Sequence, residues 1–291
     1  MTTPSTSNAH PHPQPSHGAV SAPEQLWQGQ AGYVSPVPLR RATLKDALAS
    51  EWTKIRSVRS TLWNFGVMIA LVLGIGTLIA LFLSRSDLPV GESAVALGFV
   101  GVLLGVMPVM TLGVMTISSE YGTGMIRTTL TACPSRARVL GAKAIVFGVL
   151  TFLVTLVATT LTSAVLVLAL GGRSSVSVWG WATVGVSAYV ALIGLFALAV
   201  GALLRHSAGA ITVMIGFVLL PLVMALFLAA TALNGLQDFL LEYSIPSQLG
   251  VFYGTAMGAA SPGGWEALGI MGGLTAVFLG LAFFVQDRRD V

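Results

Sequence analysis

The chain offers few residues that could do chemistry, and most of them are charged residues grouped in short stretches. No Gly-x-x-x-x-Gly-Lys-[Ser/Thr] loop occurs, so ATP hydrolysis by a phosphate-binding loop is not expected. Gly-x-Ser-x-Gly and His-Glu-x-x-His are also missing, and Cys133 is the only cysteine, which excludes an intrachain disulfide. We therefore expect no catalytic residue, no metal site and no cofactor within this chain.

The charged stretches that remain are suited to binding and pairing. The first lies in 43–61, where apolar residues recur every three or four positions and predict a helix lying in the membrane interface. Thr43 and Asp46 fit a capping box at its start. Glu51 falls inside the apolar stripe, so its carboxylate should prefer a protein partner to lipid.

The second charged stretch, 119–143, is the longest connection between predicted spans on the expected cytoplasmic side. Gly122 to Thr131 predicts a short helix, Pro134 ends it, and Ser135 can cap a following helix of about 36 residues, about 54 Å long. That helix would project below the bilayer before entering it. A short helix below the bilayer would give a soluble partner a surface to bind. The simpler alternative is a basic loop whose only role is to fix the orientation of the spans in the membrane.

Composition places most of the remaining chain in a membrane. Hydrophobic residues make up 55% of it and charged residues 9%, against about a quarter charged in soluble proteins. Uncharged runs long enough to cross a bilayer predict an all-α membrane protein with six transmembrane helices. The predicted spans are about 62–83, 94–118, 144–170, 181–204, 209–233 and 267–286.

Neither ion coupling nor nucleic-acid binding is favoured by the charges. No ionisable residue lies at mid-depth in a predicted span, and ion-coupled carriers usually need one. Glu266 comes nearest, but it is expected at an interface beside Trp265. The basic residues stand at span ends, which indicates membrane topology rather than a nucleic-acid surface.

The distribution of Lys and Arg predicts that both termini are cytoplasmic. With the N-terminus inside, thirteen basic residues lie on the cytoplasmic side, and only Arg85 and Arg173 lie outside. Residues 1–39, by contrast, contain no Lys or Arg and seven of the thirteen prolines. This composition predicts a disordered cytoplasmic tail, separate from a six-span domain over 40–291. His10, His12 and His17 in the tail are expected to be ordinary polar residues rather than a metal site.

Three stretches together resemble the type-2 family of ATP-binding-cassette (ABC) transporter permeases. They are Ser50-Glu51-Trp52-Thr53-Lys54-Ile55-Arg56 before the first span, Glu120-Tyr121-Gly122-Thr123 with Arg127, Pro134, Arg136 and Lys143, and Arg288-Arg289-Asp290-Val291 after the last. Each stretch is weak alone, but their order and the six-span layout make the combination more specific. The resemblance covers 43–291.

The resemblance implies a permease that pairs with a separate ATPase subunit, which would bind the ATP and Mg. It places the partner contact on the interfacial helix and on a coupling helix between spans two and three. The implied contact residues are Glu51, Trp52, Lys54, Glu120, Tyr121, Gly122, Thr123, Arg127 and Arg136. It further implies a homodimer or heterodimer of permeases in a bacterial cell membrane, surrounded by lipid, exporting drugs, antibiotics, lipids or glycans. A non-transporting membrane scaffold or an accessory immunity protein is the alternative.

Overall fold

The fold was analysed in a computed structural model of the 291-residue chain. It describes residues 42–86, 94–171, 175–228, 233–256 and 261–288. The predicted tail, 1–39, and the last three residues of the C-terminal basic stretch lie outside these ranges.

Six helical segments in the described ranges are long and apolar enough to cross a membrane, which confirms the predicted all-α class and number of spans. In four of them (α2, α5, α8 and α11) less than a third of the most apolar window is buried, and exposed apolar side chains such as Phe82, Leu168 and Leu226 cover the rest, as a lipid-facing surface requires. The chain is therefore a multi-pass membrane protein. The segments are α2 (Arg59–Leu83), η2 with α3 (Ala94–Gly98 and Phe99–Gly122), α5 (Arg136–Leu170), α6, the π-helical η3 and α7 (Val176–Gly180, Trp181–Gly185 and Val186–Leu204), α8 (Ser207–Leu228) and α11 (Gly264–Arg288).

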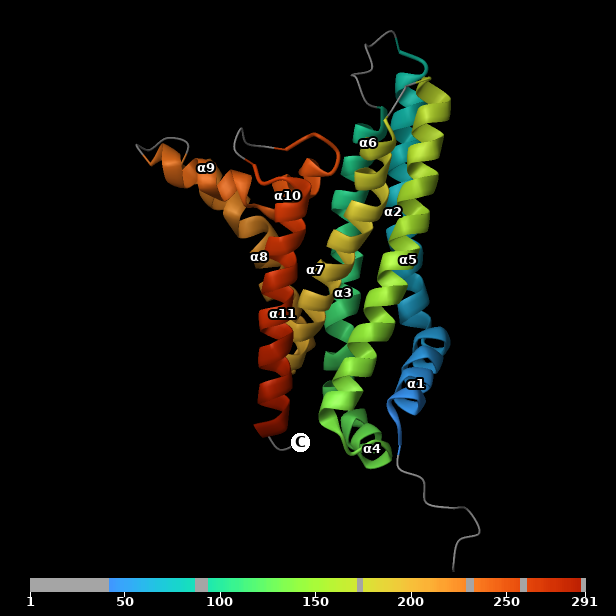
Figure 1. Ribbon diagram of the computed structural model, residues 1–291, viewed down its shortest axis with the longest axis vertical. Coiled ribbons are helices and arrows are strands. Elements are labelled where there is room, and N and C mark those ends of the chain that lie inside the picture. Colours follow the sequence, from blue (N-terminus) through green and yellow to red (C-terminus); the bar gives the residue numbers. More distant parts are fainter. Residues whose placement is uncertain (1–41, 87–93, 172–174, 229–232, 257–260, 289–291) are drawn as a thin grey trace, which may run out of the picture. The chain divides into compact units, whose positions relative to one another are not determined.

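Four shorter helices lie at the two ends of these segments (Figure 1). Helices α1 (Leu44–Ser57) and α4 (Met125–Ala132) lie at the end where α11 finishes, called the α4 end below. Helices α9 (Asn234–Glu242) and α10 (Ile245–Val251) lie at the opposite end. The capping box of α1 is confirmed: the Thr43 side chain accepts from the Asp46 backbone, and the Asp46 carboxylate accepts from the Thr43 backbone.

Helix α7 forms the centre of the packing. In its segment 78% of the most apolar window is buried, against 17% for α8 and for α11. It packs against α3, α5, α8 and α11, and its Tyr189, Ile193 and Leu198 are fully covered. The other spans therefore present one face to α7 or its neighbours and the other face to lipid.

Glycines allow the closest helix contacts. A Cβ added to Gly113 of α3 would overlap the carbonyl oxygen of Gly194 on α7. A Cβ on Gly101 would lie 2.9 Å from the carbonyl oxygen of Val72 on α2. The Gly101–Gly105 pair thus serves packing within one chain. Gly269 and Gly273, spaced in the same way on α11, have open space around them in the described structure.

Candidate functional site

Four charged side chains meet in a closed ring at the α4 end. Lys143 of α5 donates from Nζ to Glu51 of α1 at 2.8 Å and to Glu120 of α3 at 2.6 Å. Lys54 of α1 donates to the same two carboxylates, at 2.8 and 2.9 Å. Two ammonium groups thus alternate with two carboxylates, and the formal charges of the ring cancel. We call these four residues the ion ring.

Each helix of the ring brings its residue there for a local reason. Glu51 and Lys54 are three apart on α1, so they share one helix face. Ser135 caps α5 by accepting from the backbone of Arg138, as predicted, which starts the helix two turns before Lys143. Arg138 also donates to the carbonyl oxygen of Ala42 at 2.6 Å, and this bond holds the start of α1 beside α5.

The ring is largely removed from solvent. The exposed fractions of the Lys143, Glu51 and Glu120 side chains are 1%, 6% and 7%, whereas that of Lys54 is 28%. Taking charges out of water costs several kcal/mol per ion, and only close, well-bonded partners offset that penalty. The ring is therefore intolerant of losing one member. Burial alone would lower the pKa of Lys54, but hydrogen bonds and charges from Glu51 and Glu120 outweigh it and raise that pKa above 10.5.

The ion ring makes one further hydrogen bond, and one of its carboxylate oxygens has no donor. Lys54 also reaches the hydroxyl of Thr129 on α4 at 3.5 Å, so the short helix is tied to the same charges. The Oε2 of Glu120 is buried and accepts no hydrogen bond in the described structure. A buried acceptor without a donor costs about 1–3 kcal/mol, which offsets part of what the ion pairs of the ring contribute.

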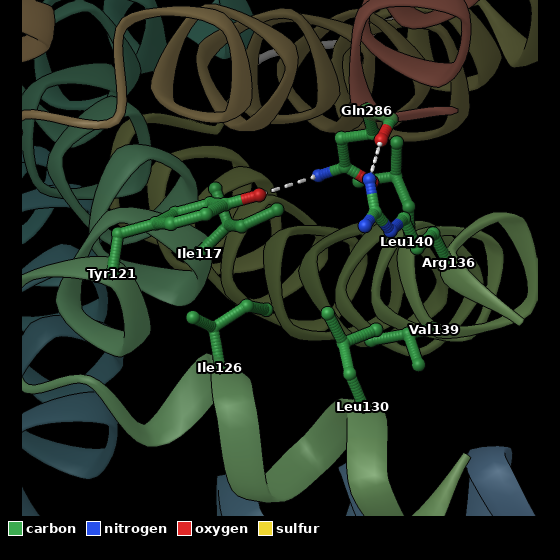
Figure 2. A pocket seen from close by; sticks show the side chains of 8 residues that line it. All are labelled: Ile117, Tyr121, Ile126, Leu130, Arg136, Val139, Leu140 and Gln286. Atoms are coloured by element: carbon green, nitrogen blue, oxygen red, sulfur yellow. Dashed lines mark hydrogen bonds between the residues drawn. The ribbon is translucent and has the colours of Figure 1, made fainter. Parts of the chain in front are cut away.

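A second polar cluster lies beside the ring, built around the residue after Glu120. The hydroxyl of Tyr121 accepts from the side-chain amide of Gln286 on α11 at 3.2 Å, and Arg136 of α5 donates to the Gln286 carbonyl oxygen at 2.6 Å (Figure 2). The guanidinium of Arg205, just after α7, lies 4.8 Å from the centre of the Tyr121 ring, a cation–π distance. Glu120 and Tyr121 thus connect the end of α3 to two different sets of helices.

Helix α4 packs against these two clusters through its apolar side chains. Its first turn follows Gly124, whose φ of 73° is a left-handed conformation that favours glycine. Ile126 and Leu130 lie with Tyr121 and Arg136 around a small cavity of about 10 Å³ between α3, α5 and α11 (Figure 2). Arg127 and Thr128, the two residues that follow Ile126, are exposed.

The predicted contact residues fall into two groups. Trp52, Gly122, Thr123 and Arg127 are exposed and free to meet another chain. The others bond within the chain: Glu51, Lys54 and Glu120 in the ion ring, and Tyr121 and Arg136 in the second cluster. The inward placement of Glu51 agrees with the expectation that its carboxylate needs a protein partner.

Sequence reasoning did not place Lys143, Arg205 and Gln286 in the site. Lys143 belongs to the second stretch of the family resemblance and to the thirteen inside basic residues, but neither observation gave it a partner. The sequence did hold one indication, since a carboxylate inside an apolar stripe is expected to have a partner within the protein. Gln286 gave no signal, because a lone amide at a span end is common.

Two cavities flank the ion ring, and both are lined by Glu51 and Lys54. One, of about 320 Å³, lies between α1 and α4 and includes Asp46, Thr128 and Cys133 among its walls. The other, of about 300 Å³, lies between α1, α2 and α3. Within the described ranges no group of three or more His, Cys, Asp or Glu residues is placed to hold a metal.

Comparison with known proteins gives no assignment: no protein-family model matches the chain, and no protein of curated function matches it. Function must therefore be argued from the residues and their geometry.

Proposed function

We propose that this chain is the membrane-spanning permease subunit of an ATP-driven exporter and pairs with a separate ATPase chain. One observation carries the proposal: α1 and α4, the two helices outside the spans at the α4 end, are joined to α3 and α5 through a single buried ion ring. A displacement of α1 or α4 by a bound partner is therefore passed to two spans.

The surface that would receive the partner is the exposed side of these two helices. Trp52 is 46% exposed on α1, and Arg127 is exposed on α4. The cavity of about 320 Å³ between the helices gives a partner side chain a place to enter. Large aromatic and Arg side chains often contribute most to binding at such contacts. Glu51 and Glu120 then act by positioning α1 and α3 rather than by direct contact.

The proposal places α1, α4 and both termini in the cytoplasm of a bacterial cell, where ATP is supplied. The Lys and Arg count supports this orientation, since the α4 end carries most of the basic residues. The working unit would be a dimer of permeases with two ATPases. The exported compound would be a drug, antibiotic, lipid or glycan.

Co-purification with a P-loop ATPase encoded next to this chain tests the proposal. The double variant Trp52→Ala with Arg127→Gln should weaken ATPase binding by about ten-fold or more, because it removes the two exposed anchors. Arg85→Gln, an exposed arginine at the other end of α2, is the matched control and should bind normally. If no ATPase binds the unaltered chain, while the chain alone protects its host from a toxic compound, the accessory immunity alternative holds instead.

A further inference from the structure

The second polar cluster, formed by Tyr121, Arg136, Arg205 and Gln286 and called the Tyr121 cluster below, joins helices that the ion ring does not reach. The ring connects α1, α3, α5 and α4. Gln286 lies in the last turn of α11, and Arg205 directly follows α7. Both side chains meet Tyr121, so the ends of α7 and α11 are fixed to the same turn of α3 that carries Glu120.

Gln286 is held in place from two sides. It is 6% exposed, although the next two residues, Asp287 and Arg288, are exposed. Its side-chain amide donates to the Tyr121 hydroxyl at 3.2 Å, and its backbone carbonyl accepts from Arg136 at 2.6 Å (Figure 2). The last four carbonyls of a helix have no intrahelical donor, and a positive charge beside them is favourable. Arg136, the first residue of α5, therefore caps the end of α11.

The backbone at Arg205 is strained at the point where its side chain joins the cluster. Its φ of 54° is left-handed, and among the described residues no other non-glycine residue has a positive φ. Helices often end at a glycine in this conformation, because a side chain there costs free energy. The guanidinium of Arg205 lies 4.8 Å from the centre of the Tyr121 ring, and this cation–π contact offsets part of that cost. The end of α7 is thereby fixed to Tyr121.

Helix α4 is in contact with the Tyr121 cluster as well as with the ion ring. Ile126 and Leu130 point from α4 into the small cavity that Tyr121, Arg136 and Gln286 also line (Figure 2). This cavity, of about 10 Å³, has room for about one water molecule at most. Because the space is so small, α4 cannot move toward the cluster without displacing the side chains around it. A displacement of α4 is therefore passed to Gln286.

We propose that Gln286 is a positioning residue that carries the motion of α4 to α11, and that Tyr121, Arg136 and Arg205 hold it in that role. The inference rests on the proposed function, to which it adds a second route from a bound ATPase to the spans. The ion ring passes the motion to α3 and α5, whereas the Tyr121 cluster passes it to α7 and α11. Loss of the Gln286 contact should therefore separate ATP hydrolysis from export and leave the partner bound.

The contact can be tested without any partner, because the chain has only one cysteine. In a Cys133→Ser background, spin labels at Thr128→Cys on α4 and Arg288→Cys on α11 report the distance between these helices. The measurement is double electron–electron resonance in lipid nanodiscs. Gln286→Leu, which removes the side-chain amide, should broaden the distance distribution. Asp287→Asn, at the exposed neighbouring position, is the matched control and should leave it unchanged.

A double-mutant cycle shows whether the hydrogen bond itself is responsible. Tyr121→Phe keeps the ring beside Arg205 but removes the hydroxyl, so it should broaden the distribution as Gln286→Leu does. Combining the two changes should add nothing, because both remove the same hydrogen bond. Gln286→Glu should give the narrow distribution again, because its carboxylate can accept from the Tyr121 hydroxyl. Additive broadening, or no recovery with Gln286→Glu, would show a general loosening of the fold and overturn the inference.

Measurements with the ATPase separate this inference from the proposed function. Gln286→Leu should still co-purify with the ATPase and hydrolyse ATP within about two-fold of the unaltered pair, while export per ATP falls about five-fold or more. Tyr121→Phe takes its place if Gln286→Leu does not fold. Unchanged export per ATP, or an unchanged distance distribution, would overturn the role of Gln286 and leave the proposed function standing on the ion ring. If no ATPase binds the unaltered chain, the proposed function fails and the coupling role of Gln286 fails with it.

Discussion

At the scale of single residues, the four side chains of the ion ring depend on one another, because each ion is paired with two others. Lys143 is its most buried member and the only cation that α5 contributes to it. Lys143→Met keeps the length of the side chain but leaves two carboxylates facing Lys54 alone. Breaking a buried ion pair in this way costs about 3–5 kcal/mol, so a clear fall in the thermal unfolding midpoint in detergent is expected.

The control for this variant is Lys45→Met, which removes an exposed lysine from α1 and should change stability by about 0.5 kcal/mol or less. Adding Glu120→Gln to Lys143→Met restores the charge balance and should recover part of the loss. If Lys143→Met unfolds at the temperature of the unaltered chain, the ring does not contribute to holding α1, α3 and α5 together.

The ion ring could be predicted only in part, because its members lie far apart in the sequence. The position of Glu51 within an apolar stripe indicated that it needs a partner. The partner, Lys143, is 92 residues away in sequence, and only the packing of α1 against α5 brings the two together. Likewise, nothing local distinguishes Glu120, which bonds inward, from Arg127, which faces outward.

At the scale of elements, the sequence predicted the number of spans because lipid demands long uncharged runs. The start of α5 was also predicted, since Ser135 after Pro134 is a strong cap signal. The short α10 begins just after Ser244 and carries Pro246 in its first turn, where the missing N–H of proline costs nothing. The fifth span was expected over 209–233; α8 covers Ser207–Leu228, and 229–232 lie outside the described residues.

Replacing glycine by alanine should change stability in opposite directions at two positions, Gly113 in the contact between α3 and α7 and Gly280 on α11. Gly113→Ala places a methyl group against the Gly194 backbone, so the helices must separate, at about 1–3 kcal/mol. Gly280→Ala on α11 meets no atom within 4 Å, and there alanine should be neutral or stabilising by up to about 1 kcal/mol. Thermal unfolding of both variants in the same detergent compares them; equal midpoints would show that α3 and α7 are not so closely packed.

At the scale of the whole molecule, the two ends of the bundle differ in chemistry. The α4 end carries the ion ring, the Tyr121 cluster and most of the described basic residues. The other end carries α9, with Asp238 and exposed Leu236 and Phe239, and the buried α10. Such asymmetry is what a membrane protein needs if one side meets a soluble motor and the other side meets the exterior.

Orientation in the membrane is the last prediction, and the proposed function depends on it. Pro134 between α4 and α5 and Asp238 on α9 lie at opposite ends of the bundle (Figure 1). A reporter inserted after Pro134 should therefore read as cytoplasmic and one after Asp238 as external, because basic residues resist translocation. Charge reversal provides the control: adding lysines around Asp238 while removing Arg56 and Arg59 should increase the inverted fraction. A cytoplasmic signal at Asp238 in the unaltered chain would leave α1 and α4 away from ATP, and the ion ring would then need another purpose.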